Sequence, residues 1–451
     1  MFNSLLRAAA IAALLACADA SAGNGDADPT FGAGGVVIIN YDLANTNGAE
    51  FGTRTLVQPQ GYVLVGTISV GNNVTPEYDL FLTRVDRNGA VDAAFGTGGG
   101  LTRLSATGQF DFVGGASIAP DDSLLVVVHG AFGGDPSAVV KLSADGIPDN
   151  SFGSGGVVLL PNFTAGDVIG LGGGKVLVSG LYAGLDFAVL RLDADGSADT
   201  TFGNQTPMDG FALSPGGDLV NAMVVQTDGK IVLAGSGDFG FPSGDDFYVM
   251  RFTDTGDVDT TFNNTGTVQV GFDRCGSNPS FTFQNRDVVN ALAVQPNGAI
   301  LVAGTAAGYC DAPTGNLGSA AGVVRLNADG TIDNDFGKQL LQHAIGYDTQ
   351  GAGIVFQGGR IFVATTANGG FATGTDFGLA HLNYSGTPHL AWGNAGYTHY
   401  DLGLATNDTA AAMVLDGMQP IVIGTRDVTY PDTDMGVLRI SNDSIFGDGF
   451  D

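Results

Sequence analysis

VVQTDGKIVLAG at Val224–Gly235 and DFYVMRFTDTGDVDTTF at Asp246–Phe262 are the two stretches that decide the fold. Both contain short runs of Val, Ile, Leu, Tyr or Phe, which are typical of strands packed on both faces. The first also contains an Asp-Gly pair, Asp228-Gly229, and the second has Gly256 after Thr255; such glycines supply the positive φ angles that tight hairpin turns require. The two stretches therefore predict consecutive antiparallel strands joined by short turns.

The same order of signals recurs along the chain. A D-x-x-F-G anchor, or a close variant of it, ends each repeat, and its aromatic residue stands at Phe31, Phe95, Phe152, Phe202, Phe262, Phe336 and Trp392. Between anchors come a strand, a hairpin turn, a second strand, a variable loop and a third strand, and a Gly-rich strand such as GGVVLL follows the anchor. Four strands in a repeat of about 50 to 70 residues are typical of a propeller blade. We predict an all-β, seven-bladed β-propeller with four-stranded blades over residues 23–440.

A second regularity concerns charge. A cation stands eight residues before the anchor acid in five repeats, as Arg84 and Asp92, Lys141 and Asp149, Arg191 and Asp199, Arg251 and Asp259, and Arg325 and Asp333. In the sixth repeat His381 and His389 replace both, which indicates that the two positions touch, as a structural ion pair in the other repeats.

The last cation and the first acid have no partner within their own repeats. Arg439 has Gly447 eight residues on, and Asp28 lies at the start of the chain. We therefore predict that they pair, and that a strand near Gly34–Asn40 closes the ring beside Asp434–Ile440. Closure removes exposed sheet edges, which are sites of aggregation.

These repeats resemble a known family. The order V-Q-x-D/N-G-K-I-x-V-A-G, D-F-x-V-x-R-L and D-G-x-x-D-x-x-F-G-x-G-G is similar to the delta-60 repeat of exported bacterial proteins, which are regarded as β-propellers. The resemblance covers about residues 24–440 and departs from the pattern in the sixth repeat. It implies no catalytic residues. The ending IFGDGFD, within a tail at 441–451, is similar to a C-terminal tail of many exported gammaproteobacterial proteins.

The first 22 residues predict export. Arg7 precedes an apolar run at Ala8–Ala16 and then small residues, the layout of a secretory signal peptide. The run is shorter than the roughly 20 residues that a transmembrane helix needs. We expect a secreted or periplasmic protein. In the alternative reading, LLAC ending at Cys17 is a lipoprotein box and anchors the chain through a lipid.

The net charge limits the classes of partner that the protein can bind, and the cysteine content predicts a disulfide. The chain has 17 Lys+Arg against 46 Asp+Glu, a net charge of −29, which excludes a nucleic-acid-binding protein because phosphate binding needs clustered cations. No later stretch is long enough to span a membrane, and we expect a monomer. After export only Cys275 and Cys310 remain, an even pair that predicts a disulfide.

Residues that recur in every repeat are interpreted as scaffold. Acids that stand five residues before the repeated cation or its substitute are expected to cap the loops entering those strands, or alternatively to form a cation-binding ring: Asp79, Asp186, Asp246, Asp376 and Asp434. Asp193, Asp195 and Asp199 resemble part of a calcium loop but lack the ligand series of a full site. GLGGGKV at Gly170–Val176 lacks the Ser or Thr of a phosphate loop. We therefore predict no metal and no cofactor.

The strongest non-repeating feature is a pair of insertions around the fifth blade, at 272–287 and 305–320. In a propeller both loops emerge on one face, where a Cys275–Cys310 bond would join them. They carry side chains of the kinds enriched in binding hot spots: Arg274, Phe281, Phe283, Arg286 and Tyr309. This cluster is the predicted binding site. The alternative is that the insertions are surface loops with no binding role.

Two functions follow. The first is a non-catalytic exported scaffold that binds a protein or a glycan through one face, since G-x-S-x-G, H-E-x-x-H and C-x-x-C are all absent from the sequence. The alternative is a secreted hydrolase or lyase that uses acidic residues at the channel mouth of the same face. Such a site would be recognised by geometry and not by sequence order.

Overall fold

The computed structural model describes residues 25–41, 49–70, 77–108, 110–130, 135–183, 186–204, 210–215, 219–238, 244–272, 285–308, 318–343, 348–368, 374–403, 406–429 and 432–441. Their regular structure is β-strand, apart from one 3-10 turn, η1 (Gly172–Gly174). The prediction of an all-β chain is confirmed for these residues. In the same ranges, no helix combines the length and the hydropathy that a bilayer crossing needs.

The strands form four-stranded antiparallel units that follow one another along the chain. The first unit contains β2 (Glu50–Gln58), β3 (Gly61–Ser69), β4 (Tyr78–Asp86) and β5 (Leu101–Leu104). The second contains β6 (Phe112–Ile118), β7 (Leu124–His129), β8 (Ser137–Leu142) and β9 (Val157–Leu160). The third contains β10 (Phe163–Gly170), β11 (Val176–Tyr182), β12 (Asp186–Leu192) and β13 (Phe211–Pro215).

The next two units share one sheet. They are β14 (Leu219–Val225), β15 (Ile231–Asp238), β16 (Asp245–Phe252) and β17 (Thr267–Val270), and then β18 (Asn285–Val294), β19 (Ile300–Gly308), β20 (Ser319–Leu326) and β21 (Lys338–Leu341). A parallel pairing of Asp245 with Arg286 joins β16 to β18. A further unit contains β22 (Thr349–Gln357), β23 (Arg360–Asn368), β24 (Thr375–Leu382) and β25 (Tyr397–Tyr400).

The remaining unit combines both ends of the chain. It contains β26 (Asp408–Asp416), β27 (Gln419–Thr429), β28 (Asp432–Arg439) and the amino-terminal β1 (Val36–Ile39), in the order β1-β28-β27-β26. β1 is antiparallel to β28, with Val36 opposite Leu438 and Ile39 opposite Met435. The amino-terminal strand therefore occupies the outer position that a fourth strand occupies in the other units.

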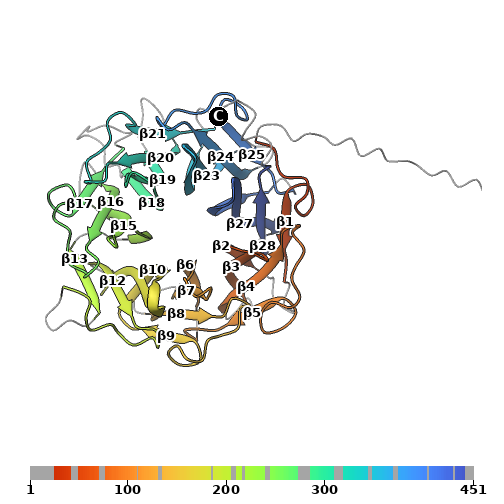
Figure 1. Cartoon of the computed structure of the whole chain (residues 1–451). Helices are drawn as coiled ribbons and strands as arrows, with labels where there is room; N and C mark the ends of the chain where they lie inside the picture. Colours follow the sequence, from red (N-terminus) through yellow and green to blue (C-terminus); the bar gives the residue numbers. More distant parts are fainter. Residues whose placement is uncertain are drawn as a thin grey trace, which may run out of the picture.

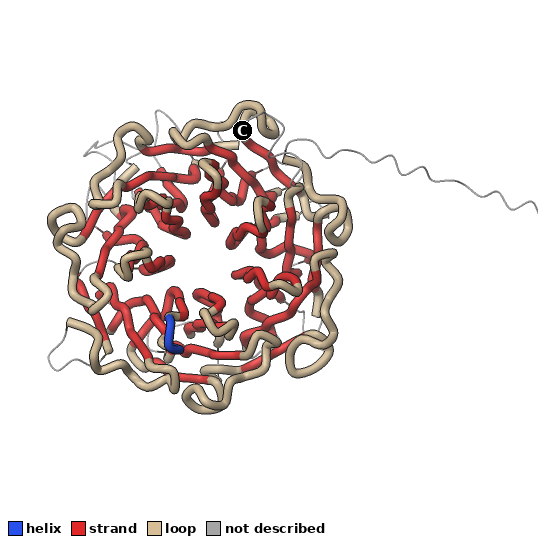
Figure 2. The backbone as a smooth tube through the Cα atoms, viewed as in Figure 1, coloured by secondary structure: helices blue, strands red, loops and turns tan. Residues whose placement is uncertain are grey.

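The units are arranged around a central axis, with first strands such as β2, β6, β10 and β18 nearest the axis and short fourth strands such as β5, β9 and β13 at the periphery (Figure 1). Loops follow the outer rim, as the backbone tube shows (Figure 2). The fold is therefore all-β and propeller-like, and residues of the first strands line the axis.

Neighbouring units are interlocked by the anchor motif. The Phe95 side chain is fully buried, and the amide of Gly96 donates to the carbonyl of Asp145 in the turn of the next unit at 2.8 Å. Gly146 of that turn has φ of +78°, and a Cβ there would lie 2.5 Å from the Phe95 ring. The Asp-Gly turn therefore needs glycine both for its backbone conformation and for the close approach of the preceding unit.

The hydrophobic core lies between the sheets. One cluster combines Val249 and Phe262 with Ile300 and Val324 of the following unit, all fully buried. Burying a side chain of this size contributes about 1.5–3 kcal/mol. Because each cluster spans two units, packing between neighbouring sheets holds the arrangement around the axis.

Candidate functional site

The repeated ion pairs predicted from the sequence are formed in the structure. The N···O distances are 2.7 Å for Arg84–Asp92, 3.6 Å for Lys141–Asp149, 2.6 Å for Arg191–Asp199, 2.7 Å for Arg251–Asp259, 2.8 Å for Arg325–Asp333 and 2.9 Å for Arg439–Asp28. The last pair joins residues that are 411 positions apart. The eight-residue spacing thus reflects a contact across the turn that leads into each anchor.

Arg251 shows how completely such a cation is satisfied. Its side chain is 5% exposed; Nε donates to Asp259, and Nη1 donates to the carbonyl of Ala328 in the next unit at 2.6 Å. The guanidinium carbon also lies 4.5 Å from the centroid of the Phe262 ring. Burial raises the pKa of Asp259, but hydrogen bonds to its oxygens and the charge of Arg251 outweigh burial and lower that pKa overall. These cations are part of the scaffold.

The sixth repeat replaces the ion pair with a stack of rings. The rings of His381 and His389 lie 4.7 Å apart at an interplanar angle of 19°. His381 also stacks on Phe362 at 4.5 Å and meets Trp392 edge-on at 5.6 Å. The two positions touch here as well, through aromatic contact instead of charge.

The acids near the start of the third strands include two that contact side chains of neighbouring strands. Asp79 lies 3.2 Å from Nε of Arg103 on β5, and Asp246 accepts a hydrogen bond from Gln269 on β17 at 2.5 Å. The loops that these acids were expected to cap lie mostly outside the described residues. Cross-strand pairing is therefore the role that the structure displays for them.

The acids of the calcium-like segment bind protein groups. Asp195 accepts hydrogen bonds from the amide and hydroxyl of Ser197 at 2.9 and 2.6 Å. Lys175 lies 2.8 Å from Asp199 and also pairs with Asp193, and hydrogen bonds to these two carboxylates raise the pKa of Lys175. Lys175, from the segment Gly170–Val176, is thus a third member of the repeated ion pair of Arg191 and Asp199.

The predicted binding cluster around the fifth unit lies largely outside the described residues, which do not include Arg274, Cys275, Phe281, Phe283, Tyr309 and Cys310. Arg286 is described, and its side chain is 64% exposed with Nε 3.2 Å from the Asp245 carboxylate. This residue therefore lies beside the bridge between two units, at an accessible position. The cluster and its disulfide remain predictions.

The axis carries a feature that the sequence analysis did not predict. The first strand of each unit has a β-bulge at the same level, and the bulged residues are Thr53, Gly114, Gly166, Asn221, Asn290, Ala352 and Ala411. A bulged residue has no partner opposite it on the neighbouring strand, and a bulge bends the strand and redirects its side chains. Because most of these residues are small, the bulges form an open ring around the axis.

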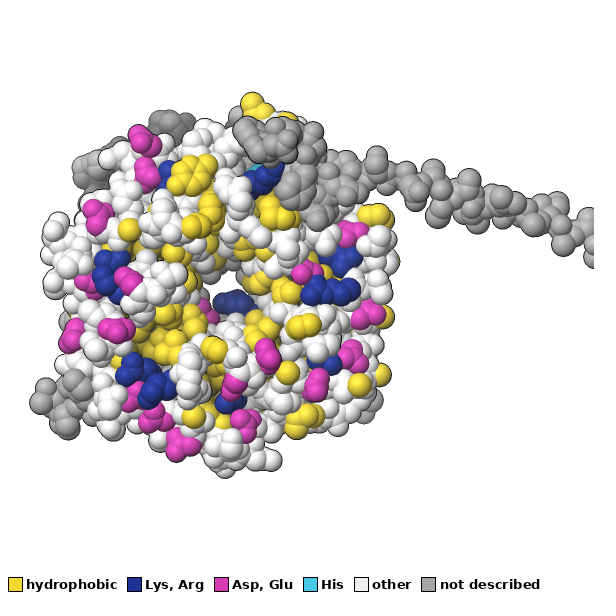
Figure 3. Space-filling view, in the orientation of Figure 1, with side chains coloured by type: hydrophobic (Ala, Val, Ile, Leu, Met, Phe, Trp, Pro, Cys, Tyr) yellow, Lys and Arg dark blue, Asp and Glu magenta, His cyan; other side chains and the backbone are white. Residues whose placement is uncertain are grey.

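Two cavities meet at this ring. The first chamber, of about 280 Å³, is lined by Thr53, His129 and Thr164 among others, and the second, of about 190 Å³, by residues that include Asp167 and Met223. Arg54, Asn221, Asn290 and Ala411 line both chambers. The molecular surface is hollowed at the axis, and atoms of a basic side chain are visible in the hollow (Figure 3).

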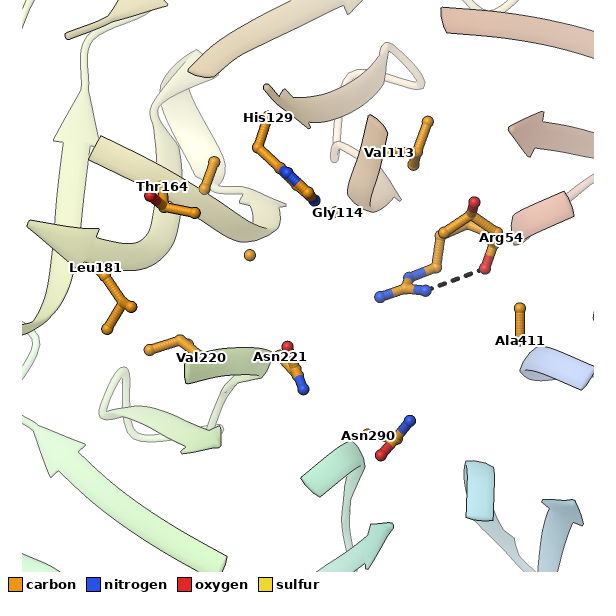
Figure 4. Close-up of a pocket in the computed structure, with 13 residues that line it drawn as sticks. Arg54, Val113, Gly114, His129, Thr164, Leu181, Val220, Asn221, Asn290 and Ala411 are labelled. Carbon is orange, nitrogen blue, oxygen red and sulfur yellow. Dashed lines mark hydrogen bonds between the residues drawn. The ribbon is translucent and has the colours of Figure 1, made fainter. Parts of the chain in front are cut away.

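Arg54 is the basic residue in the lining of both chambers. Its side chain extends into the first chamber from β2 (Figure 4). Nη1 donates one hydrogen bond, to the carbonyl of Thr53 at 3.0 Å. Burial lowers the pKa of Arg54, and the charge of Asp167 opposes that effect. An arginine has five N–H donors, so most of this guanidinium faces the chamber without a protein acceptor among the described residues.

Asp167 stands at the same position of β10, directly after the bulge. Its two carboxylate oxygens accept hydrogen bonds from the amides of Val168 at 2.9 Å and Met223 at 3.0 Å. Gly115 makes room for it, because a Cβ there would lie 2.3 Å from Oδ1. Burial raises the pKa of Asp167, and the charge of Arg54 lowers it. Asp167 thus joins neighbouring first strands through backbone contacts.

Three further polar side chains complete the lining. His129 Nδ1 lies 3.0 Å from the carbonyl of Gly130 and donates to it, so Nε2 is an acceptor when the ring carries a single proton. Asn221 donates Nδ2 to the carbonyl of Val289 at 2.7 Å, which leaves its side-chain oxygen as an acceptor. Asn290 lies between Asn221 and Arg54 in the close-up view (Figure 4). The lining therefore combines one cation with several acceptors.

A carboxylate cluster lies where β24 meets β26. Oxygens of Asp376, Asp401 and Asp408 lie within 4.8 Å of one another, a geometry that could hold a metal ion, whereas the sequence predicted no metal. Burial raises the pKa of Asp408 to about 7; a hydrogen bond from the amide of Leu402 opposes this, and the charges of Asp401 and Asp376 add to it. The sequence did not reveal the cluster because Asp376 on β24 is far in the chain from Asp401 and Asp408, which lie just before and at the start of β26.

Comparison with known proteins supports the fold class. The family described as "Domain of unknown function (DUF5122) beta-propeller" matches residues 174–202, 226–262 and 295–336. No curated protein matches the chain in sequence.

Several solved structures are similar to this chain at low sequence identity. The propeller domain of the Trilobed protease from Pyrococcus furiosus is 8% identical with a TM-score of 0.45 and covers 88% of this chain and 98% of its own. Polysaccharide lyase Uly1 is 10% identical with a TM-score of 0.48, covering 90% and 98%. Drosophila Semaphorin 1a, extracellular domains 1-2, is 10% identical with a TM-score of 0.44, covering 89% and 88%.

Proposed function

We propose that the chain is an exported, seven-bladed propeller of the delta-60 repeat type that binds a glycan without catalysis. The pairing of β1 with β28 and the Arg439–Asp28 contact support a ring closed by the two chain ends. The seven sequence repeats support the blade count and the repeat type, and the match to a β-propeller family supports the fold. In this proposal residues 23–440 form one propeller.

The ring of bulges around the axis carries the binding proposal. It opens a polar chamber of about 280 Å³, near the lower limit of known small-molecule pockets, and so fits one sugar unit. Acceptors on Asn221 and His129 suit the hydroxyl groups of a sugar. The ligand is therefore a glycan end that enters along the axis, and not a flat protein surface.

A substitution that fills the junction between the two chambers tests this proposal. Ala411 lines both chambers, so Ala411→Phe should fill the junction and abolish binding to a glycan array or in calorimetry. Leu390→Phe is the matched control, because Leu390 is 74% exposed on the surface and lies on neither chamber. Thermal unfolding must show that both variants remain folded. Undiminished glycan binding by a folded Ala411→Phe protein would exclude the channel.

A second candidate function is a secreted hydrolase or lyase, which the carboxylate cluster favours. Asp408 is buried beside Asp376 and Asp401, and its raised pKa suits a general acid near neutral pH. Turnover of a polysaccharide by the wild type that is lost in Asp408→Asn and retained in Ala411→Phe would establish this function in place of the first.

Export and the disulfide complete the proposal. We expect cleavage after residue 22, so the mature protein should start at Gly23, whereas acylation of Cys17 would give a lipid-anchored form instead. Mass spectrometry of the protein from the culture medium and the periplasm distinguishes these outcomes. Peptide mapping without reductant should show Cys275 bound to Cys310.

A further inference from the structure

The cations of this protein differ in how well they are neutralised. Most of the described lysines and arginines pair with a carboxylate, as Arg251 does with Asp259. Arg54 forms no ion pair within 4.0 Å in the described part of the chain and donates one hydrogen bond, to a neutral carbonyl. In a chain with 46 acidic residues, an unpaired arginine at the axis calls for a physical reason.

Asp167 does not supply the missing partner. Both of its oxygens already accept backbone amides, one of them from Met223 on the next first strand. Its charge acts on Arg54 from a distance, but no contact joins the two groups. The guanidinium therefore keeps its planar fork of donors directed into the first chamber (Figure 4).

We propose that this chamber binds the carboxylate of a sugar acid through Arg54. The inference rests on the proposed glycan-binding function and names its ligand class. A carboxylate matches the guanidinium in charge and in geometry, because two parallel N–H···O bonds can form. A bound carboxylate also offsets the cost of keeping a cation at a partly buried position, which a neutral sugar cannot do.

The rest of the chamber fits the remainder of such a ligand. The side-chain oxygen of Asn221 and Nε2 of His129 can each accept a hydrogen bond from a sugar hydroxyl. Thr53 and Thr164 add hydroxyl groups to the wall. The small volume limits the ligand to about one sugar ring, so the acidic unit would be terminal. A simple inorganic anion would leave these acceptors unused.

The experiment compares two sugars that differ only at C6. D-glucuronate and D-glucose are titrated into the full mature protein by calorimetry at pH 7. A charge-assisted bidentate contact contributes about 1.5–3 kcal/mol, which corresponds to a factor of about 10 to 100 in Kd. We expect glucuronate to bind at least 10-fold more tightly than glucose. Arg54→Gln should remove this difference by weakening the binding of glucuronate to about the level of glucose.

Two further variants make the test specific. Arg54→Lys keeps the charge without the fork and should give an intermediate Kd for glucuronate, which also serves if Arg54→Gln does not fold. Arg103→Gln removes an exposed arginine on the peripheral strand β5, which lines neither chamber, and should change neither Kd. Equal affinity for both sugars, or unchanged glucuronate binding in a folded Arg54→Gln protein, would overturn the inference.

Failure of this inference is distinguishable from failure of the proposed function. If glycans bind in a way that Ala411→Phe abolishes and all of them are neutral, the channel is the site and the sugar-acid assignment is wrong. If Ala411→Phe has no effect on any glycan, the proposed function is wrong. If glucuronate and glucose both fail to bind, the assignment is also wrong.

Discussion

Arg251 and Arg54 place the same side chain in two opposite surroundings. Arg251 contacts a carboxylate, a backbone carbonyl of the next unit and an aromatic ring. Arg54 lies on the axis, and among the described residues its one hydrogen-bond acceptor is the carbonyl of Thr53. The first arrangement recurs around the molecule and stabilises it, whereas the second occurs on one first strand and leaves donors available. Residues that recur in the repeats, such as Arg251, therefore form the scaffold, whereas a residue that departs from the repeat, such as Arg54, marks the candidate site.

The largest effect should come from breaking the repeated arrangement. Arg325 is the clearest target, because in the described part of the chain it is the one cation that pairs with Asp333, whereas Lys230 also pairs with Asp259. Arg325→Met leaves the Asp333 carboxylate without its partner and should lower the free energy of unfolding by about 3 kcal/mol. Chemical denaturation measures the change.

The control is Arg286→Met, which removes an exposed arginine at the rim of the same unit. Exposed pairs contribute about 1 kcal/mol or less, so this variant should unfold close to the wild-type midpoint. Equal loss of stability in the two variants would mean that burial of the repeated pair does not distinguish it.

The next effect concerns the pair that joins the chain ends. Asp28→Asn removes the charge that faces Arg439 and keeps one side-chain oxygen, which can still accept the hydrogen bond from Thr30. We expect a loss of about 2 kcal/mol and faster proteolysis near β1. Asp92→Asn, within a single repeat, is the control, and its loss should be no greater. Resistance of β1 to proteolysis in the Asp28→Asn protein would contradict a clasp held by this pair.

The sequence revealed the scaffold because most of its repeated ion pairs join residues that are close together in the chain. Arg251 and Asp259 are eight residues apart, and the joint loss in His381 and His389 marked them as neighbours. Even β1, far from β28 in the chain, was predictable because Asp28 was left over from the count.

The two chambers at the axis were not predicted from the sequence, because the residues that line them are far apart in the chain and come together only in the folded protein. Bulges have no residue signature, and the side chains of one ring come from many first strands. A signal did exist, because the residue after each bulge stands four positions before the turn residue, such as Gln58, Gln226 or Gln295. At that position Arg54 and Asp167 are the charged exceptions. Aligning first strands on their turns would have found both.

The third prediction uses pH and the carboxylate cluster. The pKa of Asp408 is about 7 in the folded protein, against an ordinary value of about 4. The folded state therefore binds the proton more tightly than the unfolded state, and stability falls as pH rises from about 4 to 7 and then levels off. Asp408→Asn should stabilise the protein at pH 8 by about 1–2 kcal/mol, with a smaller gain at pH 4.5.

Thermal unfolding at the two pH values measures this gain. Asp401→Asn is the matched control, because Asp401 belongs to the same cluster but is exposed and should give a smaller effect. A lower melting temperature of Asp408→Asn at pH 8 would contradict the raised pKa and would indicate that the ionised carboxylate has a stabilising partner.

The smallest effect on stability should come from a substitution of Arg54 itself. Arg54→Met removes one hydrogen bond to a neutral carbonyl and a distant interaction with Asp167, while it relieves the cost of burying a charge. These contributions oppose one another, so the free energy of unfolding should change by less than about 1 kcal/mol. Denaturation beside Arg325→Met measures both on one scale. A loss as large as that of Arg325→Met would make Arg54 a scaffold residue, since a side chain kept for a ligand stabilises the complex and contributes little to the free protein.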